Sequence, residues 1–307
     1  MAGMTFLASA QGPNTKLRPD ETVLLYADSF DGNIDPVYGK KIISAGFEMA
    51  EDNKFAEPEA IDLKNGNIER TAGLARVDLY FPKKANGQMI VVCPGGGYRC
   101  TSTWNEGVYV AEWLLERGIT VAVVKYRMPN GHYRIPLTDV QNAFRYCRSK
   151  AQEWGVDQIG VMGFSAGGHL TMLSYLHNTT PYKPKFLCPI YPVVTMNDER
   201  FAHKRSRRGA LGVWRQFNHH MRDSLSIEDH ITEDCPPVFL VNCKDDPIVK
   251  YQNSELLDSA LTQKNVPHKY IQYETGGHGF GASEHKGTEE CRNWKNEFLV
   301  WISNFNQ

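Results

Sequence analysis

The chain has 307 residues, of which 41% are hydrophobic and 11% aromatic, and its formal net charge is −1. This length and composition exclude a disordered chain and suffice for one large α/β domain or two small ones. The balanced charge does not indicate a nucleic-acid partner or an anionic membrane. The sequence contains no run of 18 or more apolar residues, so no transmembrane helix is expected.

The seven cysteines are dispersed along the chain and form no C-x-x-C pair, which argues against a zinc site or a redox motif. Most of them lie in apolar stretches, where buried structural thiols are expected. Their odd number leaves at least one free thiol in a monomer. They are Cys93, Cys100, Cys147, Cys188, Cys235, Cys243 and Cys291.

The first ten residues resemble the end of a secretory signal peptide. Ala8-Ser9-Ala10 has the small-x-small form of a signal-peptidase site, although the basic segment expected before it is missing. We therefore expect residues 1–10 to be a signal remnant and the protein to be secreted or periplasmic. A leader with chance alanines is the alternative.

Residues 11–73 carry no motif that indicates a function. A short strand is expected at 23–26, residues 28–38 are rich in turn formers, and 42–49 are mixed. We expect this segment to be an extension that wraps or precedes the main sheet.

From residue 74 to 307, apolar strands alternate with helical patterns, which predicts one domain of the α/β class. Such continuous apolar strands are typical of a mostly parallel sheet with helices on both faces. The expected strands are 75–81, 89–93, 119–124, 159–162, 186–190, 238–243 and 269–273. The expected helices are 108–117, 136–154, the segment that follows Ser165, 254–263 and 289–305.

Residues 158–170 contain the feature around which the site is predicted. An apolar strand runs into G-F-S-A-G at 163–167, and leucines at helical spacing follow. This is the G-x-S-x-G pattern in its strand–turn–helix context, where glycines relieve crowding around a strained serine. The pattern predicts Ser165 as a nucleophile, and an ordinary glycine-rich turn is the alternative.

A serine hydroxyl needs a base that removes its proton, and His278 is the best placed of the ten histidines. It lies in G-G-H-G-F, directly after the last expected strand. His169 is on the helix that follows the serine and is expected to pack against the site. His219 and His220 fall in an insertion, and His285 falls in a loop.

The base must be oriented by an acid from the loop after the preceding strand, where the chain reads K-D-D-P-I-V. Asp246 is favoured, because Pro247 fixes the turn and Val249 anchors it, whereas Asp245 is expected to be a turn or cap residue. The resulting order of serine, aspartate and histidine is that of the α/β-hydrolase triad.

Backbone donors for a developing oxyanion are predicted at Ala166 and in the loop P-G-G-G-Y at 94–98. Glycines there allow N–H groups to face an anion. Which residue of this loop supplies the amide stays open at this point. A nucleotide-phosphate loop is disfavoured because the chain has neither G-x-x-x-x-G-K-[ST] nor G-x-G-x-x-G at this point.

Residues 197–231 interrupt the alternation with a long polar stretch. Insertions after the carboxyl ends of strands lie over the site in open α/β sheets, so this stretch is expected to be a lid. It contains the basic run H-K-R-S-R-R at 203–208, which we interpret as a solvated face, with a binding patch as the alternative. Trp214, Tyr98 and His169 are the expected substrate contacts.

Five short motifs carry a resemblance to a known superfamily over roughly residues 77–302. They are C-P-G-G-G-Y at 93–98, K-Y-R-M-P at 125–129, G-F-S-A-G-G-H at 163–169, D-D-P-I-V at 245–249 and G-G-H-G-F at 276–280. With these motifs the chain resembles the α/β-hydrolases. Within them it is similar to the carbohydrate acetyl esterases related to acetylxylan esterase and to the hormone-sensitive-lipase-like esterases.

The resemblance implies Ser165 as nucleophile, His278 as base and Asp246 as orienting acid. It also implies an oxyanion hole formed by Ala166 with Gly96 or Gly97, while Tyr98 stays an open alternative for the amide. In the lipase-like branch a histidine precedes the glycine run, whereas Pro94 stands there in this chain. That departure favours the acetyl-esterase branch.

The expected function is therefore a serine esterase that removes acetyl groups from plant-polysaccharide fragments such as xylan, a reaction that requires no metal or cofactor. A feruloyl esterase or general carboxylesterase is the alternative. A serine peptidase of the prolyl-oligopeptidase type, which carries a large additional domain, and an inactive carbohydrate-binding protein are less favoured. The sequence does not indicate the oligomeric state.

Overall fold

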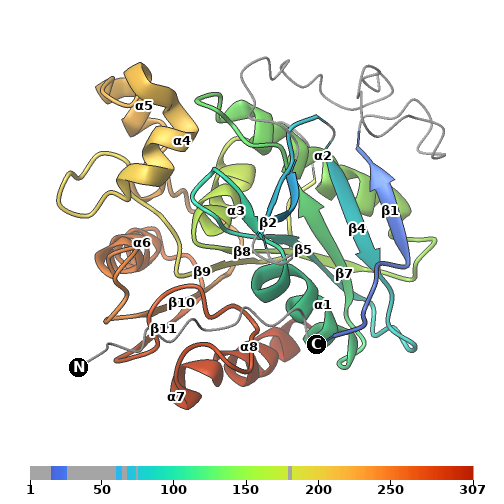
Figure 1. Cartoon of the computed structure of the whole chain (residues 1–307). Coiled ribbons are helices and arrows are strands. Elements are labelled where there is room, and N and C mark those ends of the chain that lie inside the picture. Colours follow the sequence, from blue (N-terminus) through green and yellow to red (C-terminus); the bar gives the residue numbers. More distant parts are fainter. Residues whose placement is uncertain (1–14, 26–59, 64–67, 74, 179–181, 307) are drawn as a thin grey trace, which may run out of the picture.

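An eight-stranded sheet lies at the centre of the molecule, and its strands follow the order β1-β4-β7-β5-β8-β9-β10-β11 (Figure 1). The computed structural model describes residues 15–25, 60–63, 68–73, 75–178 and 182–306. The strands of this sheet are β1 (Glu21–Leu24), β4 (Arg76–Tyr80), β5 (Gln88–Cys93), β7 (Thr120–Lys125), β8 (Gln158–Phe164), β9 (Leu187–Ile190), β10 (Val238–Cys243) and β11 (His268–Tyr273).

The six strands from β7 to β11 run parallel, while β4 is antiparallel to both of its neighbours. Strands β5, β7 and β10 are buried along their whole length, as their continuous apolar sequences predict. The expected parallel sheet with one early antiparallel strand is thus confirmed. The strand expected at 23–26 is β1, which pairs with β4 at the edge of the sheet.

Helices cover both faces of the sheet. One layer of the core contains α2 (Arg134–Lys150), α3 (Ala166–Leu176) and α6 (Gln252–Gln263). The other contains α1 (Tyr109–Leu115), α7 (Glu289–Arg292) and α8 (Trp294–Ser303). Alternate residues of β5 divide between the two layers, with Met89 and Val91 in one and Ile90 and Val92 in the other.

Three elements differ from the expectation. A second, three-stranded sheet joins β2 (Ala60–Leu63), β3 (Ile68–Arg70) and β6 (Thr101–Ser102). A π-helical turn, η1 (Trp104–Val108), precedes α1. The helix expected at 289–305 is divided into two helices at Asn293. There the Asn293 N–H donates to the Glu290 carbonyl and the Asn296 N–H donates to the Asn293 carbonyl, and such i→i+3 bonds form a tighter turn than an α-helix has. A short turn, η3 (Asn304–Asn306), follows the second helix.

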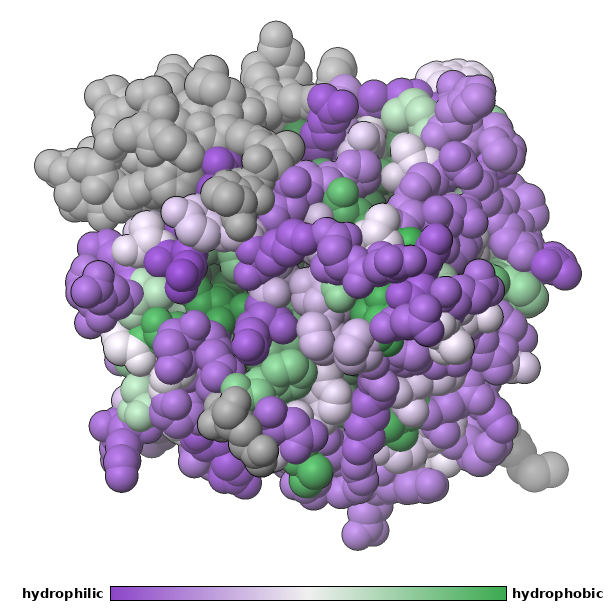
Figure 2. All heavy atoms as spheres, turned by 180° about the vertical axis from the view of Figure 1, so that it is seen from behind, coloured by the Kyte–Doolittle hydropathy of each residue, from purple (hydrophilic) through white to green (hydrophobic). Residues whose placement is uncertain are grey.

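The insertion after β9 forms α4 (Lys204–Arg215), α5 (His219–Asp223) and the short turn η2 (Ile227–Asp229). In Figure 1, α4 and α5 lie together at one end of the molecule, outside the two helical layers. The view from behind in Figure 2 shows a largely hydrophilic surface on which hydrophobic residues form separate groups.

All seven cysteines are free thiols, and all except Cys100 are buried, as expected. Among the residues that the structure describes, no helix is long and apolar enough to span a membrane. Within the same residues, no group of three potential side-chain ligands gathers at a metal site. The expectations for residues 1–10, 28–38 and 42–49 lie outside the described residues.

Candidate active site

Ser165 stands on a sharp turn between β8 and α3, at the carboxyl end of a central strand. Its backbone has φ 55° and ψ −120°, a conformation that costs energy in a residue other than glycine and that recurs at functional sites. The Ser165 N–H donates to the Ile190 carbonyl, and the Ser165 carbonyl accepts from the His169 and Val193 N–H groups. The turn is therefore held by β9 on one side and by α3 on the other.

The two glycines of the serine motif are required by close backbone approaches. A Cβ at Gly163 would lie 2.2 Å from the Gly167 carbonyl oxygen, and one at Gly167 would lie 2.0 Å from the Cys93 carbonyl oxygen. Neither distance is compatible with a side chain, so the crowding predicted from the sequence is present.

A chain of hydrogen bonds links Ser165, His278 and Asp246. The His278 Nε2 lies 2.9 Å from the Ser165 Oγ, and its Nδ1 lies 2.6 Å from the Asp246 Oδ2. A neutral imidazole in this arrangement donates its Nδ1–H to the carboxylate and accepts the serine proton at Nε2. The loops after β8, β10 and β11 thus bring together the three residues that the sequence singled out.

The two neighbouring aspartates hold different parts of this arrangement. The Asp246 Oδ1 accepts from the Ile248 and Val249 N–H groups, which fixes the carboxylate while its Oδ2 faces His278. The Asp245 carboxylate accepts from the N–H groups of Gly276 and Gly277, at 3.0 and 2.8 Å. Asp246 therefore orients the imidazole directly, whereas Asp245 caps the loop that carries it.

The glycine loop after β5 faces the serine. A Cβ at Gly95 would come within 2.9 Å of the Ser165 Cβ, and Gly96 and Gly97 have φ values of 146° and 66°. In the part of the chain that the structure describes, the N–H groups of Gly96, Gly97 and Ala166 have no protein acceptor. The Gly95 N–H, in contrast, donates to the Glu106 Oε2 at 2.8 Å. Free backbone donors beside a serine Oγ can stabilise an oxyanion that forms there.

Tyr98 and His169 belong to the frame of the site. Both are buried, at 2% and 0% exposure, and the Tyr98 hydroxyl donates to the His169 Nδ1 at 2.8 Å. The His169 Nε2–H donates to the Leu225 carbonyl, so the imidazole is neutral, and burial lowers its pKa to about 4. The Tyr98 hydroxyl and the His169 Nδ1 therefore face each other in the interior, and the substrate contacts expected at these two residues stay a prediction.

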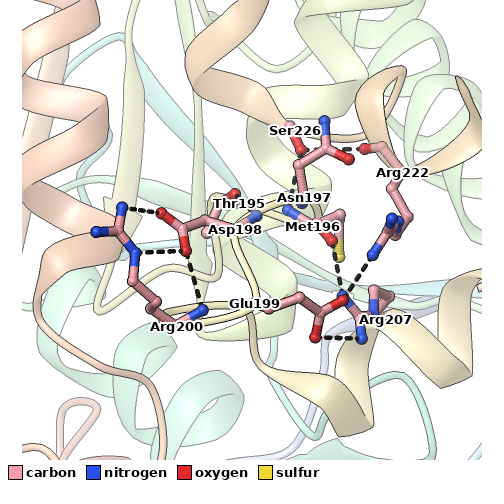
Figure 3. A network of polar contacts seen from close by, with 9 residues as sticks. All are labelled: Thr195, Met196, Asn197, Asp198, Glu199, Arg200, Arg207, Arg222 and Ser226. Carbon is pink, nitrogen blue, oxygen red and sulfur yellow. Dashed lines mark hydrogen bonds and ion pairs between the residues drawn. The ribbon is translucent and has the colours of Figure 1, made fainter. Parts of the chain in front are cut away.

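The base of the insertion is closed by a polar network (Figure 3). The Ser226 Oγ accepts from the Met196 and Asn197 N–H groups, which joins the two ends of the insertion. Glu199 points between Arg207 of α4 and Arg222 of α5 and pairs with both, at 2.8 and 2.6 Å.

The basic run 203–208 is only in part the solvated face that we expected. Lys204 and Arg208 are exposed, but Arg207 is 4% exposed because it pairs with Glu199 and donates to the Met196 carbonyl. Single-sequence patterns cannot separate these residues, since the burial depends on how α4 packs against the loops below it.

Two residues of this run lie beside the site, although the sequence indicated only the run as a whole, with a binding patch as the alternative. The Arg205 side chain passes within 3.4 Å of the position that a Cβ on Gly97 would occupy. The His203 Nδ1 is hydrogen-bonded to the Ser206 Oγ, and burial, together with electrostatic interactions with His278 and Arg205, lowers the pKa of His203 to about 4. Trp214, the third expected substrate contact, is 84% exposed on α4 and accessible to a ligand.

The comparisons with known proteins agree with this fold. The model of the BD-FAE family matches residues 77–261, which is more than half of the chain. An acetylxylan esterase of Xylanibacter ruminicola is 35% identical over 68% of this chain and 44% of its own length. An endo-1,4-beta-xylanase B of Butyrivibrio fibrisolvens is 30% identical over 62% of this chain and 32% of its own length. The chain thus spans less than half of the length of these relatives.

A crystal structure of an acetyl ester-xyloside bifunctional hydrolase from Caldicellulosiruptor lactoaceticus superposes with a TM-score of 0.71. The two sequences are 26% identical, and the match covers 95% of this chain and 99% of the hydrolase chain. A carboxylesterase from Lactobacillus plantarum, at 18% identity and a TM-score of 0.66, shares the fold.

The fold and the relatives define this chain as an α/β-hydrolase, as the sequence motifs implied. More narrowly, the chain belongs to the BD-FAE family.

Proposed function

We propose that this chain is a serine esterase that releases acetyl groups from esterified plant-polysaccharide fragments such as xylan. The observation that carries the proposal is the hydrogen-bonded chain from the Ser165 Oγ through His278 to Asp246, with backbone N–H groups beside it that bond to no acceptor among the described residues. The names of the acetylxylan esterase and of the acetyl ester-xyloside hydrolase support the substrate class.

In the proposed reaction the Ser165 Oγ attacks the ester carbonyl carbon, while the His278 Nε2 takes the hydroxyl proton. Asp246 stabilises the imidazolium that forms. The carbonyl oxygen becomes an oxyanion, which the N–H groups of Ala166 and of Gly96 or Gly97 stabilise. The intermediate then collapses, the bond to the sugar oxygen breaks, and His278 gives its proton to that oxygen.

Deacylation repeats these steps with water. His278 takes a proton from a water molecule, whose oxygen attacks the acyl carbon bound to Ser165. Collapse of the second intermediate releases acetate, and His278 returns the proton to the serine oxygen.

The insertion is proposed to select the sugar. Trp214 and Phe217 are 84% and 68% exposed on it, and exposed aromatic rings offer flat apolar surfaces to a ligand. A feruloyl esterase would need an apolar place for an aryl acyl group, and these same rings are what would favour that second candidate.

We also propose that residues 1–10 are the remnant of a secretory signal peptide, that 11–73 form an extension, and that 74–307 form the catalytic domain. The small-x-small pattern at Ala8-Ser9-Ala10 supports the first part. Mass spectrometry of secreted material should find Gln11 at the mature N-terminus, and another starting residue would contradict it.

The test is acetate release from acetylated xylan and ferulate release from a feruloylated oligosaccharide, each with wild type and with Ser165→Ala. We expect acetate release by wild type and, since the nucleophile is removed, a loss of at least about 10³-fold in the variant. Equal activity in Ser165→Ala would contradict the mechanism, and ferulate release without acetate release would establish the second candidate.

A further inference from the structure

A buried carboxylate that the proposed reaction does not use lies beneath the glycine loop. Glu106 is 3% exposed and stands on the π-helical turn η1, a type of helix irregularity that is frequent at functional sites. Its Oε2 accepts from the Gly95 N–H and its Oε1 accepts from the Tyr191 hydroxyl, both at 2.8 Å. A carboxyl group in such a place is costly unless its oxygens are satisfied.

Both oxygens of Glu106 accept hydrogen bonds, from the Gly95 N–H and from the Tyr191 hydroxyl, and such bonds stabilise the ionised form of the carboxyl group. The Tyr191 oxygen is itself an acceptor, since the Gly281 N–H donates to it at 2.9 Å. Burial raises the pKa of Glu106, and the hydrogen bond from Tyr191, the charge of His278 and the bond from Gly95 oppose this rise.

The same contacts connect the two loops on which the reaction depends. Gly95 begins the loop that presents the oxyanion donors, and Gly281 follows His278 by three residues. Tyr191 joins them through Glu106, and its own backbone is strained, with φ 38°. Its ring lies 4.7 Å from the ring of His278.

The position of Gly95 makes the bond to Glu106 consequential. A Cβ at Gly95 would lie 2.9 Å from the Ser165 Cβ and 3.0 Å from the Glu106 Oε2, so this glycine is placed between the nucleophile and the carboxylate. The Gly95 N–H donates to Glu106, and this bond fixes the start of the loop and thereby the orientation of the amides at Gly96 and Gly97.

We propose that Glu106 is a positioning residue for the ester hydrolysis, on which this inference rests. It fixes the oxyanion loop through Gly95 and, through Tyr191, holds the His278 loop in register with it. Its negative charge also stabilises the imidazolium of His278, in addition to the charge of Asp246.

This charge effect acts within a small set of groups. Around Glu106, the groups that bear on its charge are the Tyr191 hydroxyl, His278 and Lys286. Around His278, the groups are Asp246, Ser165, Tyr191, Glu106 and His203. His203 is neutral above about pH 5, because its pKa is lowered to about 4.

The experiment compares wild type with Glu106→Gln on 4-nitrophenyl acetate, an ester whose hydrolysis needs the triad but no sugar contact. We expect kcat to fall about 10- to 100-fold with KM changed by less than about twofold. The reason is that the substitution misplaces the oxyanion donors, which stabilise the transition state rather than the bound substrate. The acidic limb of the pH profile of kcat/KM should move to lower pH, because the imidazolium loses a neighbouring negative charge.

Unchanged kcat and an unchanged acidic limb would overturn the inference. A second outcome would also overturn it. In that outcome, active-site titration shows that the activity is lost only because fewer molecules are folded, and the acidic limb of the pH profile stays at its wild-type position. Wild type that hydrolyses no ester would instead contradict the proposed function, before any variant is compared.

Tyr191→Phe keeps the carboxylate and its bond to Gly95 but removes the link to Gly281. It should lower kcat by less than Glu106→Gln and leave the acidic limb near its wild-type position. Should Glu106→Gln fail to fold, wild-type kcat in Tyr191→Phe would overturn the proposed link between the two loops.

Discussion

At the scale of single residues, Asp246 and Asp245 are adjacent in sequence but differ in what they contact. Asp246→Asn should lower kcat by about 10³- to 10⁴-fold, because an amide cannot hold the Nδ1–H tautomer of His278 as a carboxylate does. Kinetics on a soluble aryl acetate measure this directly.

Asp245→Asn is the matched control. It keeps one acceptor oxygen for the N–H groups of Gly276 and Gly277, so we expect a loss of about tenfold or less. The reverse order of the two variants would contradict the assignment of Asp246 as the orienting acid.

The site residues that could be predicted from the sequence differ in one respect from Glu106, which could not. Ser165, Asp246 and His278 each follow a strand within a short motif, and parallel strands bring their carboxyl ends to one edge. Glu106 follows no strand directly and lies in a helical turn of unusual pitch. Its place beside Gly95 depends on packing, which spacing in the sequence does not reveal.

At the scale of elements, the insertion after β9 is where sequence patterns are least informative. Its polar composition predicts exposure, but Arg207 is buried because Glu199 and the Met196 carbonyl satisfy its charge. Gly212, at φ 79°, bends the chain within α4. The regular strands and helices were predictable because periodic burial sets their patterns, whereas these features arise from contacts between distant segments.

Glu199→Gln should loosen the insertion, because Arg207 and Arg222 then lose a shared anion. We expect faster cleavage by trypsin within residues 197–226 and a decrease of about 1–2 kcal/mol in the free energy of its local opening. Limited proteolysis followed by mass spectrometry locates the cuts.

Asp198→Asn provides the comparison for that measurement. Its partner Arg200 is 76% exposed in its side chain, and surface pairs contribute little. Equal cleavage rates in both variants would show that the Glu199 network does not hold the insertion.

At the scale of the whole molecule, stability should depend on pH through His169. Its pKa in the folded chain is about 4, whereas the unfolded value is 6.5. Between these values the unfolded chain binds a proton that the folded chain does not, so this contribution to stability falls as pH falls through that window and is flat above it. At pH 5 the loss from His169 is about 2 kcal/mol.

Urea unfolding of wild type and His169→Gln at pH 7 and pH 5 measures this effect. The variant should be less stable at pH 7, since its hydrogen bonds to Tyr98 and Leu225 are disturbed, but its stability should change less between the two pH values. An equal change in both proteins would contradict the assignment to His169.

The account of the whole molecule depends on acyl transfer at one serine. Treatment with an aryl phosphonate ester that mimics the tetrahedral intermediate, followed by peptide mass spectrometry, tests this claim most directly. We predict one covalent adduct, on Ser165, that appears in proportion to the loss of esterase activity. Loss of activity with the adduct on another residue, or full labelling of Ser165 with activity retained, would contradict it.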